Sequence, residues 1–442
     1  MHLDFAPLTR ALAQIPRRRL FGHVAVVDGG TVGVAGLQAH AGIGDLVEIT
    51  LRQGKRMGGE VVALRADGLR VMTYGAADGL GIGDRVELMK EHGAAPDESW
   101  LGRVVDAFGK PLDGRPLFNG SCAAPLRAAP PAAATRKGLG ARLSTGLAVF
   151  NTLLPIARGQ RLGVFAGSGV GKSTLLGTLA RGIKADVVVY ALIGERGREL
   201  REFTEQVLGP AGMARAVVVA ATSDQSPLVK RRAAWMAMAV AECFRDQGRH
   251  VLLITDSITR FAEAHREVAL SAGETPSLRA FPPSTANLIA HLAERAGPGP
   301  VGAGDITAIF SVLVAGSDME EPVADITRGV LDGHFVLDRD IAERGRFPAV
   351  DVRRSVSRAL PAIASAAENE VLARARRLTA AYESAAPMIQ AGLYTHGADP
   401  VVDEAIRFYP KLEEFYSLPA EEGVAMSYLD LAQRLNMRPP AG

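Results

Sequence analysis

Residues 162–176 of this 442-residue chain read LGVFAGSGVGKSTLL. An apolar run typical of a buried strand leads into a glycine-rich turn, and a helical pattern begins at Lys172. Glycines let backbone N–H groups curl around a phosphate chain, and the N-terminus of the following helix favours a bound anion. The stretch therefore predicts a phosphate-binding loop between a strand and a helix, although Ala166 replaces the first glycine of the strict pattern.

Each position of this loop has an expected role. Lys172 is expected to reach the β- and γ-phosphates and to act in catalysis, and the Ser173 hydroxyl to coordinate Mg²⁺. A glycine-rich turn without a nucleotide is the alternative, but the complete strand, turn and helix favour a nucleotide. The predicted nucleotide-binding residues of the loop are Ala166, Gly167, Ser168, Gly169, Val170, Gly171, Lys172, Ser173 and Thr174.

A second apolar run, residues 251–255, ends in Asp256. A carboxylate at the end of such a strand is placed to hold Mg²⁺ and its water shell beside the phosphate loop. A strand that ends in Asp is a weak signal alone, because turns favour Asp. Together with the loop it makes Asp256 the predicted metal-binding carboxylate.

Another apolar run, residues 187–193, is followed by GERGRE, residues 194–199. Ligands of parallel sheets bind at the carboxyl ends of strands, so Glu195 is expected to face the same crevice. We predict that Glu195 is the general base for an attacking water and that Arg196 is a supporting catalytic contact. Arg198 and Glu199 are expected only to begin a solvated helix.

Patterns elsewhere in the chain predict an α/β fold with further domains on either side. Short β-rich runs separated by glycine turns, early in the chain, are typical of a small β-barrel. Apolar runs then alternate with helical stretches, as in a parallel sheet, and the last part has helical spacing throughout. The predicted divisions are an N-terminal amphipathic arm (1–19), a β-barrel domain (20–90), a connector (91–137), a P-loop domain with a parallel sheet (138–361) and a C-terminal helical domain (362–442).

Composition excludes several classes of protein. Hydrophobic residues make up 48% and charged residues 22%, which argues against a disordered or fibrous chain. The net charge of +2 creates no general field for nucleic acid. The two cysteines, Cys122 and Cys243, lie far apart and are expected to be reduced thiols rather than a metal site or disulfide.

No run approaches the roughly 18 to 20 apolar residues that a membrane-spanning helix needs. Within the arm, Phe5, Leu8, Leu12 and Ile15 recur at helical spacing, and Pro16 ends the pattern. So short a helix needs a surface to dock on. That surface is its own domain, a partner protein or an acidic lipid membrane.

Several segments of the chain together resemble the type III protein-export ATPases, relatives of the catalytic subunit of rotary ATP synthases, and the flagellar branch most closely. They are FAGSGVGKSTLL, LIGERGRELREFTEQ, TSDQSPLVKRRAAWMAMAVAE, DSITRFAEAHREVALSAGETPSLRAFPPS and FPAVDVRRSVSRALP, with WLGRVVDAFGKPLDG in the connector and the less specific AGLYTHGADPVVDEAI near the C-terminus. The resemblance implies a RecA-like central domain and ATP hydrolysis with Mg²⁺.

The family further implies a homohexamer with nucleotide at each subunit interface. Its arginine finger lies in a motif that is SVSR here, so Arg358 is expected to act in trans on a neighbouring subunit; an ordinary salt-bridged arginine is the alternative. Phe347 stands where the family commonly has a tyrosine that stacks on adenine, and the aromatic face is retained. Phe415 is a weaker candidate for the same contact, because aromatic residues on helices are usually core.

The resemblance also implies partners and a location. The arm would bind a stator-like regulator, and the hexamer would meet a central stalk protein, an export gate, and export substrates with their chaperones. The protein is expected in the cytoplasm, peripheral at the inner face of the cell membrane.

Alternatives remain open at this point. They are a virulence (injectisome) secretion ATPase, the catalytic subunit of a rotary ATP synthase, a noncatalytic nucleotide-binding scaffold and a hexameric nucleic-acid translocase. Phe21 and Tyr74 are the barrel's aromatic residues, too few for base stacking, so no nucleic acid is expected. Lys172 with Glu195 argues against a scaffold, and sparse acidic residues near the C-terminus mildly disfavour the rotary subunit.

Overall fold

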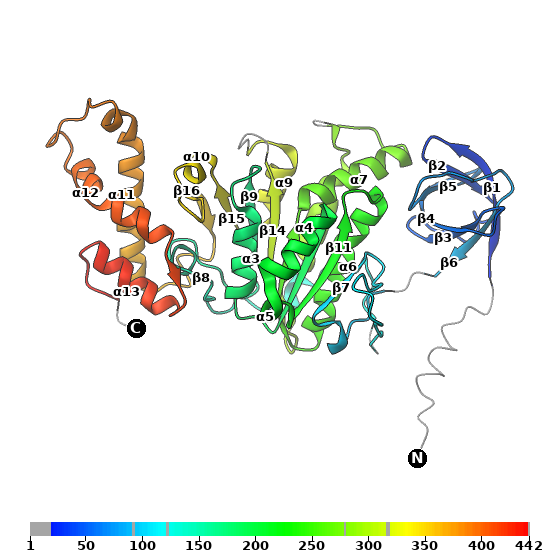
Figure 1. The fold of residues 1–442 in the computed structure, drawn as a ribbon, viewed down its shortest axis with the longest axis horizontal. Helices are drawn as coiled ribbons and strands as arrows, with labels where there is room; N and C mark the ends of the chain where they lie inside the picture. The colour runs from blue at the N-terminus through cyan, green and yellow to red at the C-terminus, as the bar shows by residue number, and fades with distance from the viewer. Residues whose placement is uncertain (1–18, 91–92, 121–122, 278–279, 315–318, 441–442) are drawn as a thin grey trace, which may run out of the picture. The chain divides into compact units, whose positions relative to one another are not determined.

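The computed structural model describes residues 19–90, 93–120, 123–277, 280–314 and 319–440 (Figure 1). The chain forms two compact units, each considered by itself. The first contains the N-terminal strands with residues 225–229 and the described part of 264–282, and the second contains the rest. The predicted arm helix (its positions 1–18) and Cys122 lie outside the described residues.

A closed antiparallel barrel forms the first unit, in the strand order β1-β2-β5-β4-β3-β6. Along β2 and β5, buried valine and leucine side chains alternate with partly buried residues, and the buried side chains fill the interior of the barrel. The predicted small barrel is thus confirmed. Its strands are β1 (Phe21–Asp28), β2 (Thr31–Ala35), β3 (Leu46–Thr50), β4 (Arg56–Arg65), β5 (Gly68–Thr73) and β6 (Arg85–Met89).

The second unit is built on a sheet whose main strand order is β16-β15-β9-β14-β12-β10-β11-β7. Neighbours from β15 to β7 run parallel, whereas β16 is antiparallel to β15, and β13 pairs antiparallel with β14 off this path. The bounds are β7 (Arg103–Val105), β9 (Arg161–Ala166), β10 (Val187–Glu195), β11 (Ala216–Thr222), β12 (His250–Asp256), β13 (Gly297–Pro298), β14 (Asp305–Leu313), β15 (Gly333–Leu337) and β16 (Val350–Ser357).

Near-continuous apolar strands, such as VVVYALI in β10, are buried because helices cover the sheet, which confirms the predicted parallel α/β domain (Figure 1). Strand β7 falls within the predicted connector but pairs with β11 at the sheet edge. The helices of this region are α2 (Ala148–Asn151), α3 (Lys172–Gly182), α4 (Gly197–Glu202), the π-helix η3 (Phe203–Leu208), α5 (Gly209–Met213), α6 (Pro227–Asp246), α7 (Ile258–Ala272), α8 (Ser284–Arg295), α9 (Pro322–Val330) and α10 (Arg339–Glu343), with short 3₁₀ turns η1 (Glu98–Trp100) and η2 (Ala133–Thr135).

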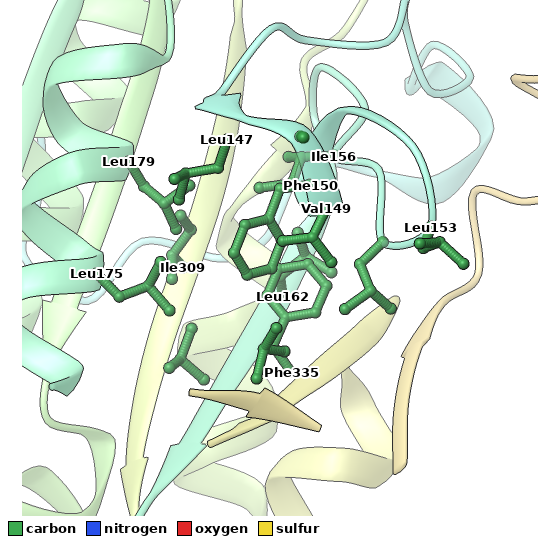
Figure 2. Packing of buried hydrophobic residues seen from close by; sticks show 14 of the residues in the cluster. Leu147, Val149, Phe150, Leu153, Ile156, Leu162, Leu175, Leu179, Ile309 and Phe335 are labelled. Carbon is green, nitrogen blue, oxygen red and sulfur yellow. The ribbon is translucent and has the colours of Figure 1, made fainter. Parts of the chain in front are cut away.

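The core between β9 and α3, the two elements that the glycine loop joins, is packed by aromatic and leucine side chains (Figure 2). The rings of Phe150 in α2 and Phe335 in β15 lie with centroids 4.7 Å apart. Leu162 of β9 and Leu175 and Leu179 of α3 belong to the same buried cluster. This packing fixes α3 against β9 and so holds both ends of the loop that joins them.

The C-terminal segment is helical, as predicted, with α11 (Ala366–Gln390), α12 (Pro400–Tyr416) and α13 (Val424–Arg434). Ser365 and Glu368 form a reciprocal capping box at the start of α11. The helices share one buried cluster with the central sheet. A two-residue strand, β17 (Pro419–Ala420), pairs with β8 (Gly146–Leu147), an addition that the helical spacing did not predict.

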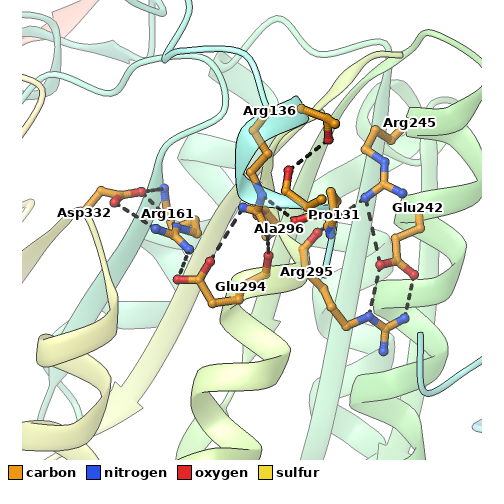
Figure 3. A network of polar contacts seen from close by, with 11 residues as sticks. Pro131, Arg136, Arg161, Glu242, Arg245, Glu294, Arg295, Ala296 and Asp332 are labelled. Carbon is orange, nitrogen blue, oxygen red and sulfur yellow. Dashed lines mark hydrogen bonds and ion pairs between the residues drawn. The ribbon is translucent and has the colours of Figure 1, made fainter. Parts of the chain in front are cut away.

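A polar network lies at the amino end of β9, opposite the glycine loop (Figure 3). Arg161 pairs with Asp332 at 3.0 Å and with Glu294 at 2.5 Å. Arg136 donates to the carbonyl oxygens of Pro131 and Ala296. The network therefore ties the connector to α8 and to the sheet.

No helix among the described segments combines the length and the apolar character that a membrane crossing requires.

Candidate nucleotide-binding site

The glycine loop leaves β9 at Ala166 and enters α3 at Lys172, as the sequence predicts. Gly169 and Gly171 have φ angles of +78° and +85°. Side chains with a Cβ rarely adopt this left-handed conformation, which explains the glycines at both positions. Nothing lies within 4 Å of the place that a Cβ on Gly169 would occupy, so the backbone there faces open space. The loop is shaped to receive an anion at the start of α3.

Lys172 and Asp256 meet beside the loop. The Lys172 ammonium pairs with Asp256 Oδ1, and the Ser311 hydroxyl donates to the same oxygen at 2.6 Å. The lysine and aspartate side chains are only 11% and 3% exposed. Asp256 ends β12 and Ser311 lies in β14, so neighbouring parallel strands bring these groups together. The ion pair thus lies where both a phosphate chain and a cation would be held.

Glu195 ends β10, the other neighbour of β12, and is half-buried. Burial, then a hydrogen bond with Glu199, then the charge of Asp256, raise the pKa of Glu195 to about 7, against the lowering effect of Lys172. The same hydrogen bond, which protonated Glu195 donates, lowers the pKa of Glu199. A carboxylate with a pKa near neutrality suits a general base.

The residues that follow Glu195 differ in their surroundings. The exposed Arg196 pairs with Glu199 at 3.2 Å, so its described partner is a carboxylate of its own helical turn. Arg198 is exposed, as the sequence predicts. Glu199, expected at a solvated helix start, is instead partly covered and contacts Glu195, because α4 begins directly at the end of β10. The geometry therefore adds Glu199 to the site.

Phe347 lies against the glycine loop. Its Cδ1 and Cε1 atoms are 3.3 Å from the position of a Cβ on Gly171, and the residue is 52% exposed. A half-exposed ring beside a phosphate loop offers a face on which a base can stack. Phe415, by contrast, is completely buried in the core, the alternative that the sequence favoured for it.

Arg358 follows β16 at the end of the strand away from the loop. In the register, Leu337 pairs with both Ala166 and Val350, whereas Gly333 pairs with Ser357. The eight residues of β16 span about 25 Å. Arg358 is exposed and lies too far from the loop of its own subunit to reach a phosphate bound there.

Other polar groups at this edge were not predicted from the sequence. Ser311 interrupts the apolar run AIFSVL within β14, and Tyr190 lies in the run VVVYALI of β10, which is a usable signal. Burial and then the charge of Asp256 raise the pKa of the fully buried Tyr190 hydroxyl. The Arg260 side chain packs over Gly194, with its Cγ 3.2 Å from the position of a Cβ there, a contact between distant segments that no local pattern predicts.

The residues present fit Mg²⁺ held together with a nucleotide. In the part of the chain that the structure describes, no group of three or more His, Cys, Asp or Glu side chains is placed to hold a metal. Mg²⁺ in phosphate-transfer sites keeps several waters and takes only one or two protein ligands besides phosphate oxygens. Buried Asp256 and the exposed Ser173 hydroxyl at the start of α3 supply such a set.

The fold and the site together define a P-loop nucleotide-binding protein. Residues 146–357 match the family model of the ATP synthase alpha/beta family, nucleotide-binding domain, and residues 364–435 match that of the T3SS EscN ATPase C-terminal domain.

The chain is also similar to individual proteins over nearly its full length. It is 45% identical to the flagellum-specific ATP synthase of Caulobacter vibrioides, covering 95% of this chain and 96% of the relative. It is 41% identical to a type 3 secretion system ATPase of Xanthomonas euvesicatoria, covering 94% and 93%. The assembled ATPase EscN, solved with its central stalk EscO from enteropathogenic E. coli, matches with a TM-score of 0.84 and 34% identity over 94% of this chain and 100% of that one. The chain belongs to the ATP synthase alpha/beta family and, within it, to the ATPases of flagellar and type III protein export.

Proposed function

We propose that this protein hydrolyses ATP with Mg²⁺ to energise flagellar type III protein export. One observation carries the proposal: Lys172 of the glycine loop pairs with Asp256, and Asp256 and Glu195 end the adjacent strands β12 and β10. Family membership makes the chain an export ATPase. The higher identity to a flagellar relative, 45% against 41%, supports the flagellar system over an injectisome.

The loop and its lysine bind the phosphate chain of ATP. Backbone N–H groups of residues 166–174 surround the phosphate chain, and Lys172 exchanges its contact with Asp256 for the β- and γ-phosphates. Ser173 and Asp256 would hold Mg²⁺, which when bound neutralises charge on the phosphate oxygens. Phe347 stacks on the adenine with its exposed face.

Glu195 prepares the attacking water. As a carboxylate it accepts the proton of a water placed in line with the γ-phosphate, and Arg196 supports this end of the site. The pKa of about 7 makes Glu195 ionised in a substantial fraction of molecules at neutral pH, yet basic enough to take a proton. The proton then resides on Glu195, where Glu199 accepts a hydrogen bond from it.

Arg358 completes the site of a neighbouring subunit. Its position at the far end of β16 supports action in trans, because it cannot reach its own glycine loop. We place it as the arginine finger at the interface of a homohexamer, where it neutralises charge that develops on the γ-phosphate. Hydrolysis then depends on assembly.

The proposed partners follow from family membership. The relative EscN was solved with its central stalk, which supports a central stalk protein as a partner here. A stator-like regulator on the N-terminal arm, the export gate, and substrates with their chaperones complete the set, with the protein in the cytoplasm and peripheral at the inner face of the cell membrane.

A nucleic-acid translocase is disfavoured by the barrel. Arg85 covers the ring of Phe21 at 3.5 Å, and partly buried Tyr74 packs against Val62, Leu228 and Val268. Neither aromatic offers the open face that base stacking requires. The match of the C-terminal helices to export ATPases likewise disfavours a rotary synthase subunit.

Removal of the lysine ammonium tests the proposal. The Lys172→Ala variant is expected to lose ATP binding and phosphate release, because the loop then lacks the cation that holds the β- and γ-phosphates. Titration of wild type and variant with ATP by calorimetry measures this, with Lys184→Ala, outside the site, as the control. Unchanged ATP affinity in Lys172→Ala would remove the assignment of the loop.

A further inference from the structure

Phe347 is connected to the C-terminal helices through its neighbour Arg346. The Arg346 side chain is only 9% exposed, and its Nε lies 3.0 Å from Oε2 of Glu413 in α12. Its Nη2 donates to the carbonyl oxygen of Val350 at 2.9 Å, and its backbone N–H to that of Ile341. The guanidinium of Arg346, which precedes Phe347, thus contacts both Val350, which follows it, and a helix outside the nucleotide-binding domain.

Glu413 is itself held in place on α12. The Tyr409 hydroxyl donates to Glu413 Oε1 at 2.6 Å. The ring of Tyr409 stacks on that of Tyr382 in α11, with centroids 3.8 Å apart and planes 12° from parallel. The Arg346 guanidinium also lies 5.3 Å from the centre of the Tyr416 ring. Both long C-terminal helices therefore contribute to the position of the Glu413 carboxylate.

The other end of this series of contacts is the phosphate loop. Phe347 follows Arg346 directly in the chain, and its ring lies on Gly171. A shift of Arg346 along α12 would move the turn and with it the ring. The contacts run from Tyr382 through Tyr409, Glu413 and Arg346 to the ring of Phe347.

We infer that Arg346 is a positioning residue for the nucleotide base: its ion pair with Glu413 sets the Phe347 ring against the loop, so that the C-terminal helices control base affinity. This inference rests on the proposed function, because it assigns the base to Phe347. Arg346 acts through Phe347 and does not touch the phosphates. Loss of the pair should therefore weaken binding of a whole nucleotide and spare binding of a bare phosphate chain.

Two ligands separate these contributions. The ADP affinity measured by calorimetry includes contacts with the base and with the phosphates. The affinity for inorganic tripolyphosphate includes only the contacts of the phosphate loop. Arg346→Gln and Glu413→Gln are each expected to weaken ADP binding about three- to tenfold, the range of a misplaced aromatic stack, and to leave tripolyphosphate within about twofold. The double variant should bind ADP no more weakly than the weaker single variant, because both changes remove one interaction.

A matched control lies next to Glu413 on α12. Glu414 pairs with Arg434 at 3.0 Å and has no described contact with the Phe347 turn, so Glu414→Gln should bind both ligands like wild type. Equal loss of both ligands in Arg346→Gln and Glu413→Gln, or no loss of either, would overturn the inference and leave the pair a structural contact. If wild type binds neither ligand, the proposed function itself fails, which is a distinct result.

Discussion

The Glu195 carboxylate owes its chemistry to its surroundings. Burial is the largest cause of its raised pKa, and the hydrogen bond with Glu199 is the next. Both favour the protonated form, because an ionised Glu195 would face two further carboxylates in a partly dry site. Lys172 works in the opposite direction and keeps the value near 7. The proposed base therefore has a pKa that suits catalysis near neutral pH.

The activity should therefore fall as the pH is lowered through about 7. As the proposed base, Glu195 must be ionised to act, so kcat/KM should decrease about tenfold for each pH unit below its pKa. In the wild type, the Glu199 carboxylate accepts a hydrogen bond from protonated Glu195. In Glu199→Gln, the amide N–H can donate to ionised Glu195, which favours the ionised form. The acid limb of the profile should consequently move to lower pH, although burial still holds the pKa above its ordinary value of 4.5.

A pH profile of ATP hydrolysis for both proteins measures this shift. Glu202→Gln, a change in an exposed carboxylate of the same helix, is the control. An acid limb that stays in place in Glu199→Gln would show that Glu199 has no influence on the base.

The sequence predicts some residues of the site and misses others. The loop and the strand-end carboxylates follow from local patterns, since a parallel sheet gathers the carboxyl ends of its strands at one edge. The sequence predicts a solvent-exposed Glu199, because a charged residue at a helix start is usually exposed. Its contact with Glu195 depends on the angle at which α4 leaves β10, which spacing alone does not encode.

A buried ion pair joins helices α6 and α8. Glu242 of α6 and Arg295 of α8 form an ion pair with side chains 4% and 0% exposed, at 2.5 and 3.0 Å (Figure 3). Arg295 also donates to the carbonyl oxygen of Leu126 in the connector. A charge so deeply buried is tolerated only with its partner.

Removal of one partner should therefore destabilise the domain. Glu242→Ala leaves the Arg295 guanidinium buried without its counter-charge, at an expected cost of about 3–5 kcal/mol. Denaturant unfolding followed by circular dichroism measures the change. The exposed pair Arg339–Glu343 provides the comparison, since Glu343→Ala should cost about 0–1 kcal/mol. A cost below about 1 kcal/mol for Glu242→Ala would contradict this account of the pair.

Elements formed by local pattern were predicted better than those formed by distant pairing. The barrel strands alternate and the long helices have apolar faces, so both were predicted. The three-residue β7 and the two-residue β17 carry no pattern of their own, and each is a strand only because β11 or β8 lies beside it. The boundaries of the predicted domains remain predictions.

The assembled molecule should need residues from two subunits at each site. Arg358 lies at the far end of β16 from the loop. If it acts in trans as proposed, a subunit that lacks Arg358 can still use the arginine of its neighbour. Arg358→Ala alone should lose about 10³–10⁵ in rate, and Glu195→Gln alone should be inactive. Mixed hexamers of the two variants should recover part of the wild-type activity, because some interfaces then hold both intact residues.

Steady-state hydrolysis by mixtures at several ratios measures the recovery, with the composition of the hexamers checked by native mass spectrometry. Demonstrably mixed hexamers without any recovered activity would contradict action in trans.

The most direct measurement compares ATP binding and inorganic phosphate release in Glu195→Gln with those of wild type, both assembled and supplied with Mg²⁺. Glutamine keeps the shape of the side chain and cannot accept the proton. ATP affinity should stay within about twofold, while phosphate release falls by at least about 10²-fold. Phosphate release at the wild-type rate in this variant would contradict the assignment of Glu195 as the general base that deprotonates the attacking water.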